Sequence, residues 1–130
     1  MKRRISFGGE VNHEWERRTL LRSWKQGRVA DEDIKDADGI LVEAARFHGK
    51  PAPVPCPVCG SDQLRHVLWI HGESLGNKTG TARSVDEIAR LVSERGPIRV
   101  HLVEVCPACR WNHLLKEFVA TAEPECSNDG

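Results

Sequence analysis

The chain has 130 residues, which suits one domain with a modest hydrophobic core. Lysine plus arginine and aspartate plus glutamate each number 19, so the net charge is zero. This balance argues against bulk electrostatic capture of nucleic acid as the main activity. No apolar run could span a bilayer, and no apolar stretch of a secretory signal follows the basic start. The sequence therefore predicts a cytoplasmic protein that does not act at a membrane.

The first part of the chain is predicted to be helical. Residues 1–9 contain a basic cluster and a glycine pair, which predict a flexible N-terminus. Residues 10–49 show two apolar helical faces and glycine stops, which predict a helical segment. Residues 1–28 hold eight basic and three acidic side chains, a local charge of +5. This is the one basic region of an otherwise balanced chain.

The composition changes after a proline-rich linker at residues 50–55, which we expect to be stiff and extended. A loop and a helix at residues 72–96 interrupt the strand pattern, and Ser84 with Glu87 predicts a capping box at the start of that helix. The tail at residues 122–130 is polar and is expected to be disordered. Apolar, β-branched segments predict three strands, at residues 64–71, 98–105 and 112–120.

Two Cys-Pro-x-Cys turns, 46 residues apart, carry the clearest chemical signal. A thioredoxin-like redox motif is one such pair at the start of a helix, whereas here there are two pairs beside strands. Two facing turns can complete the four thiolates of a tetrahedral metal site. Such a set suits zinc best, with iron as the chemical rival, and leaves zinc no open position for water. The predicted ligands of this structural zinc site are Cys56, Cys59, Cys106 and Cys109.

The order of strands and cysteine turns is that of a zinc ribbon. One strand leaves the first turn, one enters the second turn and one leaves it. The predicted fold is therefore α+β, with an N-terminal helical segment followed by a three-stranded zinc ribbon. This ribbon domain covers residues 50–121 and carries the insertion at 72–96. The fifth cysteine, Cys126, lies in the tail and is expected to be an incidental thiol.

The stretches DADGILVEAARFHG, PCPVC, HVLWIHGESLG and VEVCPACRWNHLL together resemble a family of short actinobacterial four-cysteine zinc-ribbon proteins of unknown function. The resemblance spans roughly residues 17–119 and leaves out both termini. It implies zinc at the four cysteines of the two turns and helices before the ribbon. It implies no catalytic residues.

Histidines and a tryptophan surround the predicted ribbon. Trp111 is expected to cover the zinc site, and either His113 or the local backbone is expected to orient its sulfurs. Histidines on the sheet could instead form a second metal site or an acid–base pair, but no carboxylate accompanies them at ligand spacing. Histidines at the rim of a half-buried sheet are the simpler interpretation. The residues concerned are His66, His71, His101 and His113.

Trp15, Arg18 and Arg22 form an aromatic–basic stripe at helical spacing. The stripe could stack on RNA bases and pair with phosphates, or dock on an acidic protein surface. Alternatively, the tryptophan packs against the ribbon with the arginines over it.

The sequence thus predicts a non-enzymatic zinc protein, an adaptor or regulator that binds a macromolecular machine such as RNA polymerase or the ribosome. An RNA-binding module that uses the N-terminal stripe is the first alternative, and an enzyme or second-metal protein on the histidine-bearing sheet is the second. No small-molecule substrate is predicted.

Overall fold

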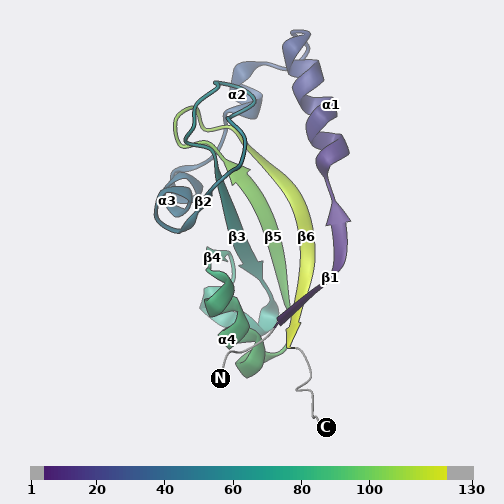
Figure 1. Cartoon of the computed structure of the whole chain (residues 1–130), viewed down its shortest axis with the longest axis vertical. Coiled ribbons are helices and arrows are strands. Elements are labelled where there is room, and N and C mark those ends of the chain that lie inside the picture. Colours follow the sequence, from purple (N-terminus) through teal and green to yellow (C-terminus); the bar gives the residue numbers. More distant parts are fainter. Residues whose placement is uncertain (1–4, 123–130) are drawn as a thin grey trace.

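The structure is a computed structural model that describes residues 5–122, and it is organised around one antiparallel sheet (Figure 1). The strand order is β1-β6-β5-β3-β2, and the short β4 pairs with the end of β3. The long strands β3, β5 and β6 lie side by side and run most of the length of the molecule. The strands are β1 (Ile5–Asn12), β2 (Lys50–Pro51), β3 (Arg65–His71), β4 (Thr81–Ala82), β5 (Ile98–Val105) and β6 (Asn112–Ala122).

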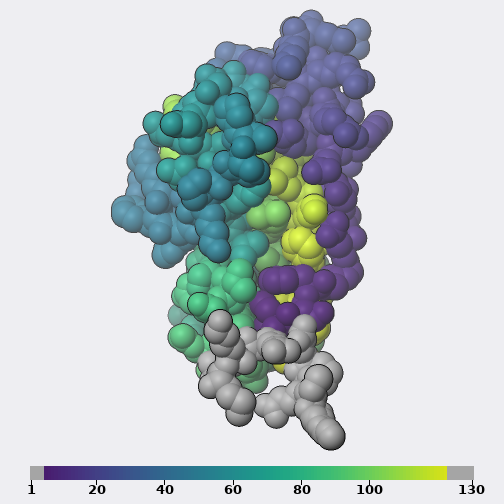
Figure 2. All heavy atoms as spheres, viewed as in Figure 1, coloured from purple at the N-terminus to yellow at the C-terminus, as the bar shows by residue number. Residues whose placement is uncertain are grey.

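The helices lie around this sheet at different heights. α1 stands beside β6 and α3 lies against β3, while α4 covers the opposite end, beside the start of β1 and the end of β6 (Figure 1, Figure 2). None of the helices within residues 5–122 has the length and apolar character needed to cross a membrane. The helices are α1 (Glu14–Lys25), α2 (Asp31–Ile34), α3 (Gly39–His48), the 3₁₀ helix η1 (Glu73–Lys78) and α4 (Val85–Arg95).

The predicted insertion forms the lower end of the molecule and packs on the sheet. Its helix begins with the predicted capping box: the Ser84 hydroxyl oxygen accepts the Glu87 N–H at 3.2 Å, and the Glu87 carboxylate accepts the Ser84 N–H at 3.0 Å. The apolar face of α4 then reaches the sheet, which buries its aliphatic side chains. The core formed here comprises Ile70, Leu75, Ile88, Leu91, Val92, Ile98, Val100 and Ala120.

A second core lies at mid-height, between α3 and strands β3 and β5. The Asp38 carboxylate caps α3 by accepting the Leu41 N–H at 2.8 Å. This core comprises Ala37, Val42, Ala45, Val67 and Val105.

A third core surrounds the cysteine turns at the upper end. It brings the buried faces of α1 and α2 against these turns, so the helical segment and the cysteine pairs fold as one unit. The indole of Trp24 also joins the two helices, because it donates to the Asp31 carboxylate at 2.7 Å. The buried residues are Leu21, Ile34, Cys56, Leu64, Cys106 and Trp111.

The structure corrects the prediction for the N-terminus. Residues 5–12 form β1 instead of a flexible arm, and the helix starts at Glu14 instead of residue 10. β1 pairs with β6 from Ile5 opposite Ala122 to Asn12 opposite Lys116. Its pairing partner is more than 100 residues away in the sequence, so local composition did not reveal the strand. Residues 1–4 of the predicted flexible segment lie outside the described residues.

The sheet is also larger than the predicted three-stranded ribbon. All three predicted strands exist, but β1, β2 and β4 extend them to six. β2 arises inside the proline-rich linker, where Lys50 and Pro51 pair with the edge of β3. The α+β class is confirmed, and the sheet has three strands more than the predicted three-stranded ribbon. The predicted tail begins at Ala122, which ends β6, and the rest of it lies outside the described residues.

Candidate metal centre

The two cysteine turns have the same backbone geometry. In the first turn, the Gly60 N–H donates to the Cys56 carbonyl at 2.9 Å, and the Cys56 N–H donates to the Ser61 carbonyl at 2.9 Å. Equivalent bonds close the second turn, each at 2.8 Å: Arg110 N–H to the Cys106 carbonyl, and Cys106 N–H to the carbonyl of residue 111. The two cysteine turns, called knuckles below, therefore match, and each of them presents two thiols.

The knuckles face each other and bring the four thiols together. The Sγ atoms of Cys56 and Cys109 are 3.7 Å apart, and those of Cys59 and Cys106 are 3.6 Å apart. All four sulfurs lie within 4.8 Å of one another. Ligands placed tetrahedrally at about 2.3 Å from a zinc ion would be about 3.8 Å apart. The predicted ligand set is thus assembled at a spacing that fits a tetrahedral metal ion.

Backbone N–H groups orient the sulfurs. The Val58 N–H donates a hydrogen bond to Cys56 Sγ at 3.4 Å. Of the two alternatives predicted for this role, the geometry favours the local backbone. Backbone N–H groups also act to lower the pKa of the other three thiols: Ser61 for Cys59, Cys109 and Ala108 for Cys106, and Trp111 for Cys109.

Burial and hydrogen bonding set the acidity of the thiols. Burial raises the pKa of the Cys106 and Cys109 thiols. Burial also disfavours ionisation of Cys59, but the Ser61 N–H and the neighbouring thiols outweigh this effect and lower its pKa. Metal ions bind the thiolate form, so a cation coordinated here would keep the buried thiols deprotonated.

Trp111, which is expected to cover this centre, lies in the same buried core as two of its cysteines. Its side chain is fully buried beside Cys56 and Cys106. His113 stacks on the indole at a ring-centroid distance of 5.8 Å, and its Nδ1 lies 2.6 Å from the Leu114 carbonyl oxygen. His113 therefore supports the tryptophan.

A buried carboxylate connects the metal centre to α1. Glu104 is only 2% exposed. Its Oε2 accepts hydrogen bonds from the Trp111 indole N–H at 2.7 Å and from Arg17 Nε at 2.6 Å. Sequence reasoning missed both Glu104 and Arg17. The available signal was an acidic residue inside the otherwise apolar end of a strand, two residues before a cysteine turn.

The sheet histidines are spread over three strands. His71 and His101 stack with ring centroids 4.5 Å apart, and His66 and His113 lie opposite Glu104 on its two neighbouring strands. Within residues 5–122, the four cysteines are the one group of three or more metal-ligating side chains gathered closely enough for an ion.

His13, which the sequence analysis did not single out, clamps the start of α1 to the sheet. Its backbone N–H donates to the Leu115 carbonyl at 2.8 Å. Its ring Nδ1 bonds the Glu16 carboxylate, and its Nε2 bonds the Glu117 carboxylate at 2.6 Å. Glu117 also contacts His101 Nε2 at 3.3 Å. The bonds to Glu117 and Glu16 raise the pKa of His13 against a smaller opposing effect of burial.

The aromatic–basic stripe of α1 is accessible. Trp15 is 67% exposed, so it does not pack on the sheet beneath a layer of arginine side chains. Arg18 and Arg22 are exposed and form no ion pair with any described residue.

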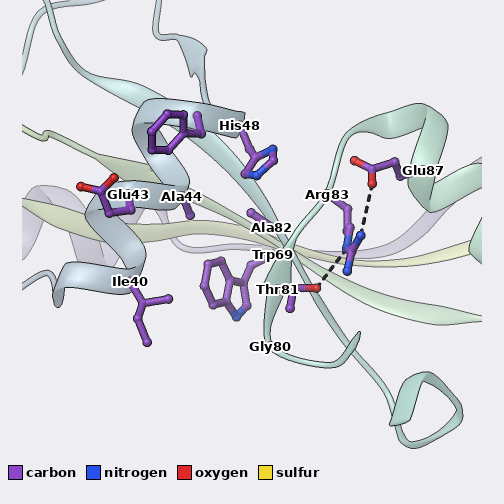
Figure 3. A pocket seen from close by; sticks show the side chains of 11 residues that line it. Ile40, Glu43, Ala44, His48, Trp69, Gly80, Thr81, Ala82, Arg83 and Glu87 are labelled. Atoms are coloured by element: carbon purple, nitrogen blue, oxygen red, sulfur yellow. Dashed lines mark hydrogen bonds and ion pairs between the residues drawn. The ribbon is translucent and has the colours of Figure 1, made fainter. Parts of the chain in front are cut away.

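An apolar hollow of about 370 Å³ lies between α3 and strands β3 and β4 (Figure 3). Trp69 lies on the strand side of this hollow, facing Ile40 on the helix. Ile40 and Phe47 on α3 are 73% and 75% exposed. Arg83 borders the hollow and bonds Thr81 at 3.1 Å and Glu87 at 3.2 Å.

The backbone of the second knuckle is strained at Arg110, whereas the first knuckle has a glycine at the equivalent position. The two knuckles should therefore respond differently to substitution at this position. Arg110 has φ 73°, while Gly60 at the equivalent position has φ 76°. No other described non-glycine residue has a positive φ. A side chain in this conformation costs roughly 1–2 kcal/mol.

We expect Arg110→Gly to stabilise the folded protein by up to about 1 kcal/mol, because the relieved strain is partly offset by the greater freedom of glycine in the unfolded chain. Gly60→Ala should destabilise it by about 1 kcal/mol, although its Cβ would meet no atom within 4 Å. Urea unfolding of the native protein and both variants, each in metal-loaded form, measures these changes in the free energy of unfolding. Destabilisation by Arg110→Gly would contradict the strain argument.

The His13 clamp predicts a pH-dependent protection of α1. The pKa of His13 is raised above 6.5, so its contribution is complete below that pH and is lost as the pH rises through the raised value. The pKa values of Glu16 and Glu117 are lowered from 4.5, mainly by the bonds to His13, so their contribution is lost only in acid.

In His13→Gln, we expect amide protection in the first turn of α1 to fall by about threefold to fivefold near pH 6. The difference from the native protein should shrink as the pH rises above the raised pKa of His13. Hydrogen exchange of the variant and the native protein at each pH measures this difference in protection. His48→Gln, which changes a histidine on α3, is the control. A difference that stays constant up to pH 9 would contradict the clamp.

Comparisons with known proteins identify the family of this chain. The chain is 42% identical over 112 residues to uncharacterized proteins of Mycobacterium bovis and Mycobacterium tuberculosis, an alignment that covers 86% of this chain and 82% of each relative. No solved structure matches it. Residues 6–129 match the family of unknown function DUF5318. The resemblance to a four-cysteine actinobacterial family is thereby confirmed, and the chain belongs to DUF5318.

Proposed function

We propose that this protein is a non-enzymatic adaptor of the cytosol, stabilised by a structural zinc ion and binding a macromolecular machine such as RNA polymerase or the ribosome. The observation that carries the proposal is the set of four thiols, held by two equivalent knuckles at tetrahedral spacing. Four protein sulfurs would fill the coordination of zinc and leave no position for a reacting water. Such a site stabilises a fold and does not catalyse.

Zinc fits the donor set better than a metal that prefers oxygen or nitrogen ligands, and iron is the remaining alternative for four thiolates. Two of the thiols, Cys56 and Cys106, are buried in the core that also holds Trp111, Leu21 and Ile34. A metal ion here would therefore connect both knuckles to α1 and α2.

An adaptor needs a surface for its partner, and α1 offers one. Trp15 is largely exposed. Arg18 and Arg22, which form no ion pair within residues 5–122, follow it by one and two helical turns. Aromatic and arginine side chains are the types enriched at the centres of protein interfaces. The exposed Ile40 and Phe47 on α3 provide a separate apolar surface. Exposed apolar groups of this size on two helices favour a protein partner.

RNA binding is the second candidate, favoured by the same exposure of Trp15 beside two arginines that no described residue pairs with. A solvent-accessible indole can stack on a base while arginines contact the phosphates. Such binding should weaken steeply with salt, whereas docking on an apolar surface should not.

The first prediction concerns the metal. Native mass spectrometry and metal analysis should find one zinc ion per chain in the purified protein. Cys59→Ala or Cys109→Ala should lose the ion and the cooperative unfolding transition, because structural zinc contributes its binding free energy to folding. Cys126→Ala, which lies outside the described residues, is the matched control and should keep both.

A protein that unfolds cooperatively without metal would contradict the structural role. Iron in place of zinc would show as visible absorbance that zinc lacks, and would change the identity of the metal but not the position of the site.

The second prediction concerns the partner. Affinity capture of tagged protein from its native host, with and without RNase, should recover a defined protein set that survives RNase. Trp15→Ser on α1 should no longer capture this set of proteins. Phe47→Ser on α3 should still capture it, which would separate the α1 surface from the α3 surface. Both side chains are exposed, so neither change should disturb the fold. A set that vanishes with RNase would favour the RNA-binding function.

A further inference from the structure

A second hollow, of about 310 Å³, lies where α1, the proline-rich linker and the central strands meet. It is separate from the four cysteines and from the apolar hollow beside α3. Its size is at the lower end of the range for small-molecule sites. The residues that line it are Glu14, Arg17, Arg18, Pro53, Val54, His66, Glu104 and Leu115.

Arg17 is held in a fixed orientation at this hollow. Its Nε bonds the buried Glu104 carboxylate at 2.6 Å, and its side chain is only 20% exposed. Its two terminal nitrogens form no hydrogen bond with any residue between 5 and 122. A guanidinium has five N–H donors in a rigid fork, so four remain available for a ligand. The ion pair with Glu104 therefore prepositions a donor group.

Two further groups in the hollow lack partners inside the described chain. Arg18 is exposed and unpaired. The His66 ring is half-buried and forms no hydrogen bond with a described residue. Burial lowers the pKa of His66, against the influence of Glu104 and together with that of Arg17. This shift favours the neutral ring, which can donate one hydrogen bond and accept another.

The charges of the hollow limit the charge of a ligand. Two arginines face two carboxylates, Glu104 and Glu14. Glu104 is already neutralised by its bond to Arg17, whereas Glu14 is exposed at the rim. A singly charged anion can use the free arginine donors, while a doubly charged phosphate would meet more repulsion from the carboxylates. Pro53, Leu115 and the 52% exposed Val54 supply an apolar wall.

We propose that this hollow binds a small organic monoanion, with its oxyanion on the free donors of Arg17 and Arg18 beside His66 and its apolar part against Pro53, Val54 and Leu115. Arginine forks match planar carboxylates in bidentate geometry, so a carboxylic acid is the ligand we expect. A phosphodiester carries the same single charge and is distinguished from it by the test. The site needs no metal ion, and it shares Arg18 with the α1 surface proposed for the partner.

The test is an NMR titration of the full-length metal-loaded protein that follows backbone amides and arginine Nε–H signals. The probes are benzoate, dimethyl phosphate and the neutral methyl benzoate. Benzoate should bind with a Kd on the order of 1 mM, as expected for a ligand of about nine heavy atoms. It should shift the signals of Arg17, Arg18 and His66, and methyl benzoate should not.

Variants distinguish binding of the anion in the hollow from its general electrostatic attraction to the basic helix α1. Arg18→Gln should weaken benzoate binding about tenfold, the loss typical of a charge-assisted hydrogen bond. Arg17→Lys keeps a cation for Glu104 but removes the fork, and should also weaken binding. Arg22→Gln removes the same charge from the same helix outside the hollow and should leave binding unchanged.

Saturable shifts with benzoate that require Arg18 support the carboxylate site. The same shifts with dimethyl phosphate alone support the oxyanion site and assign it to phosphodiesters. The proposal is overturned if neither anion gives saturable shifts, if methyl benzoate acts like benzoate, or if Arg22→Gln weakens binding as much as Arg18→Gln. None of these results bears on zinc content, and the capture experiment tests the partner through Trp15, which does not line the hollow.

Discussion

The arrangement of the upper half of the molecule depends on the two hydrogen bonds that the buried Glu104 carboxylate accepts. The donors are the indole N–H of Trp111, at the end of the second knuckle, and the Nε–H of Arg17 on α1. A buried carboxylate without partners would be strongly unfavourable, so both donors are needed in place. This requirement fixes the orientation of α1 relative to the sheet. It also places Trp111 over the cysteines and Arg17 at the hollow beside the linker.

The parts that sequence predicts well are those whose physics is local. A Cys-Pro-x-Cys spacing determines a tight turn with both sulfurs on one side, so the four cysteines could be identified without knowing the sheet. The capping box of Ser84 and Glu87 spans four residues and forms as predicted. The exposed position of Trp15 could not be predicted, because helical spacing indicates a face but not what covers it.

The parts that sequence missed depend on distant partners. β1 is a strand because β6 offers it backbone partners, and nothing in its own glycine-containing sequence requires this. The pairs Arg17–Glu104 and His13–Glu117 join residues 87 and 104 positions apart, so no local pattern contains both members. Arg110 is a different case, because its backbone is held in a glycine-like conformation by the knuckle geometry that it shares with Gly60.

The pairing of the two knuckles has a consequence for the segment between them. Both ends of the chain from Cys59 to Cys106 are held at one point, and β3 and β5 align the sides of this segment. The entropy of closing a loop grows only slowly with its length. The length of the segment between β3 and β5 can therefore change at little cost to the cysteine site, provided that the side chains of η1 and α4 that form a core with the sheet are kept.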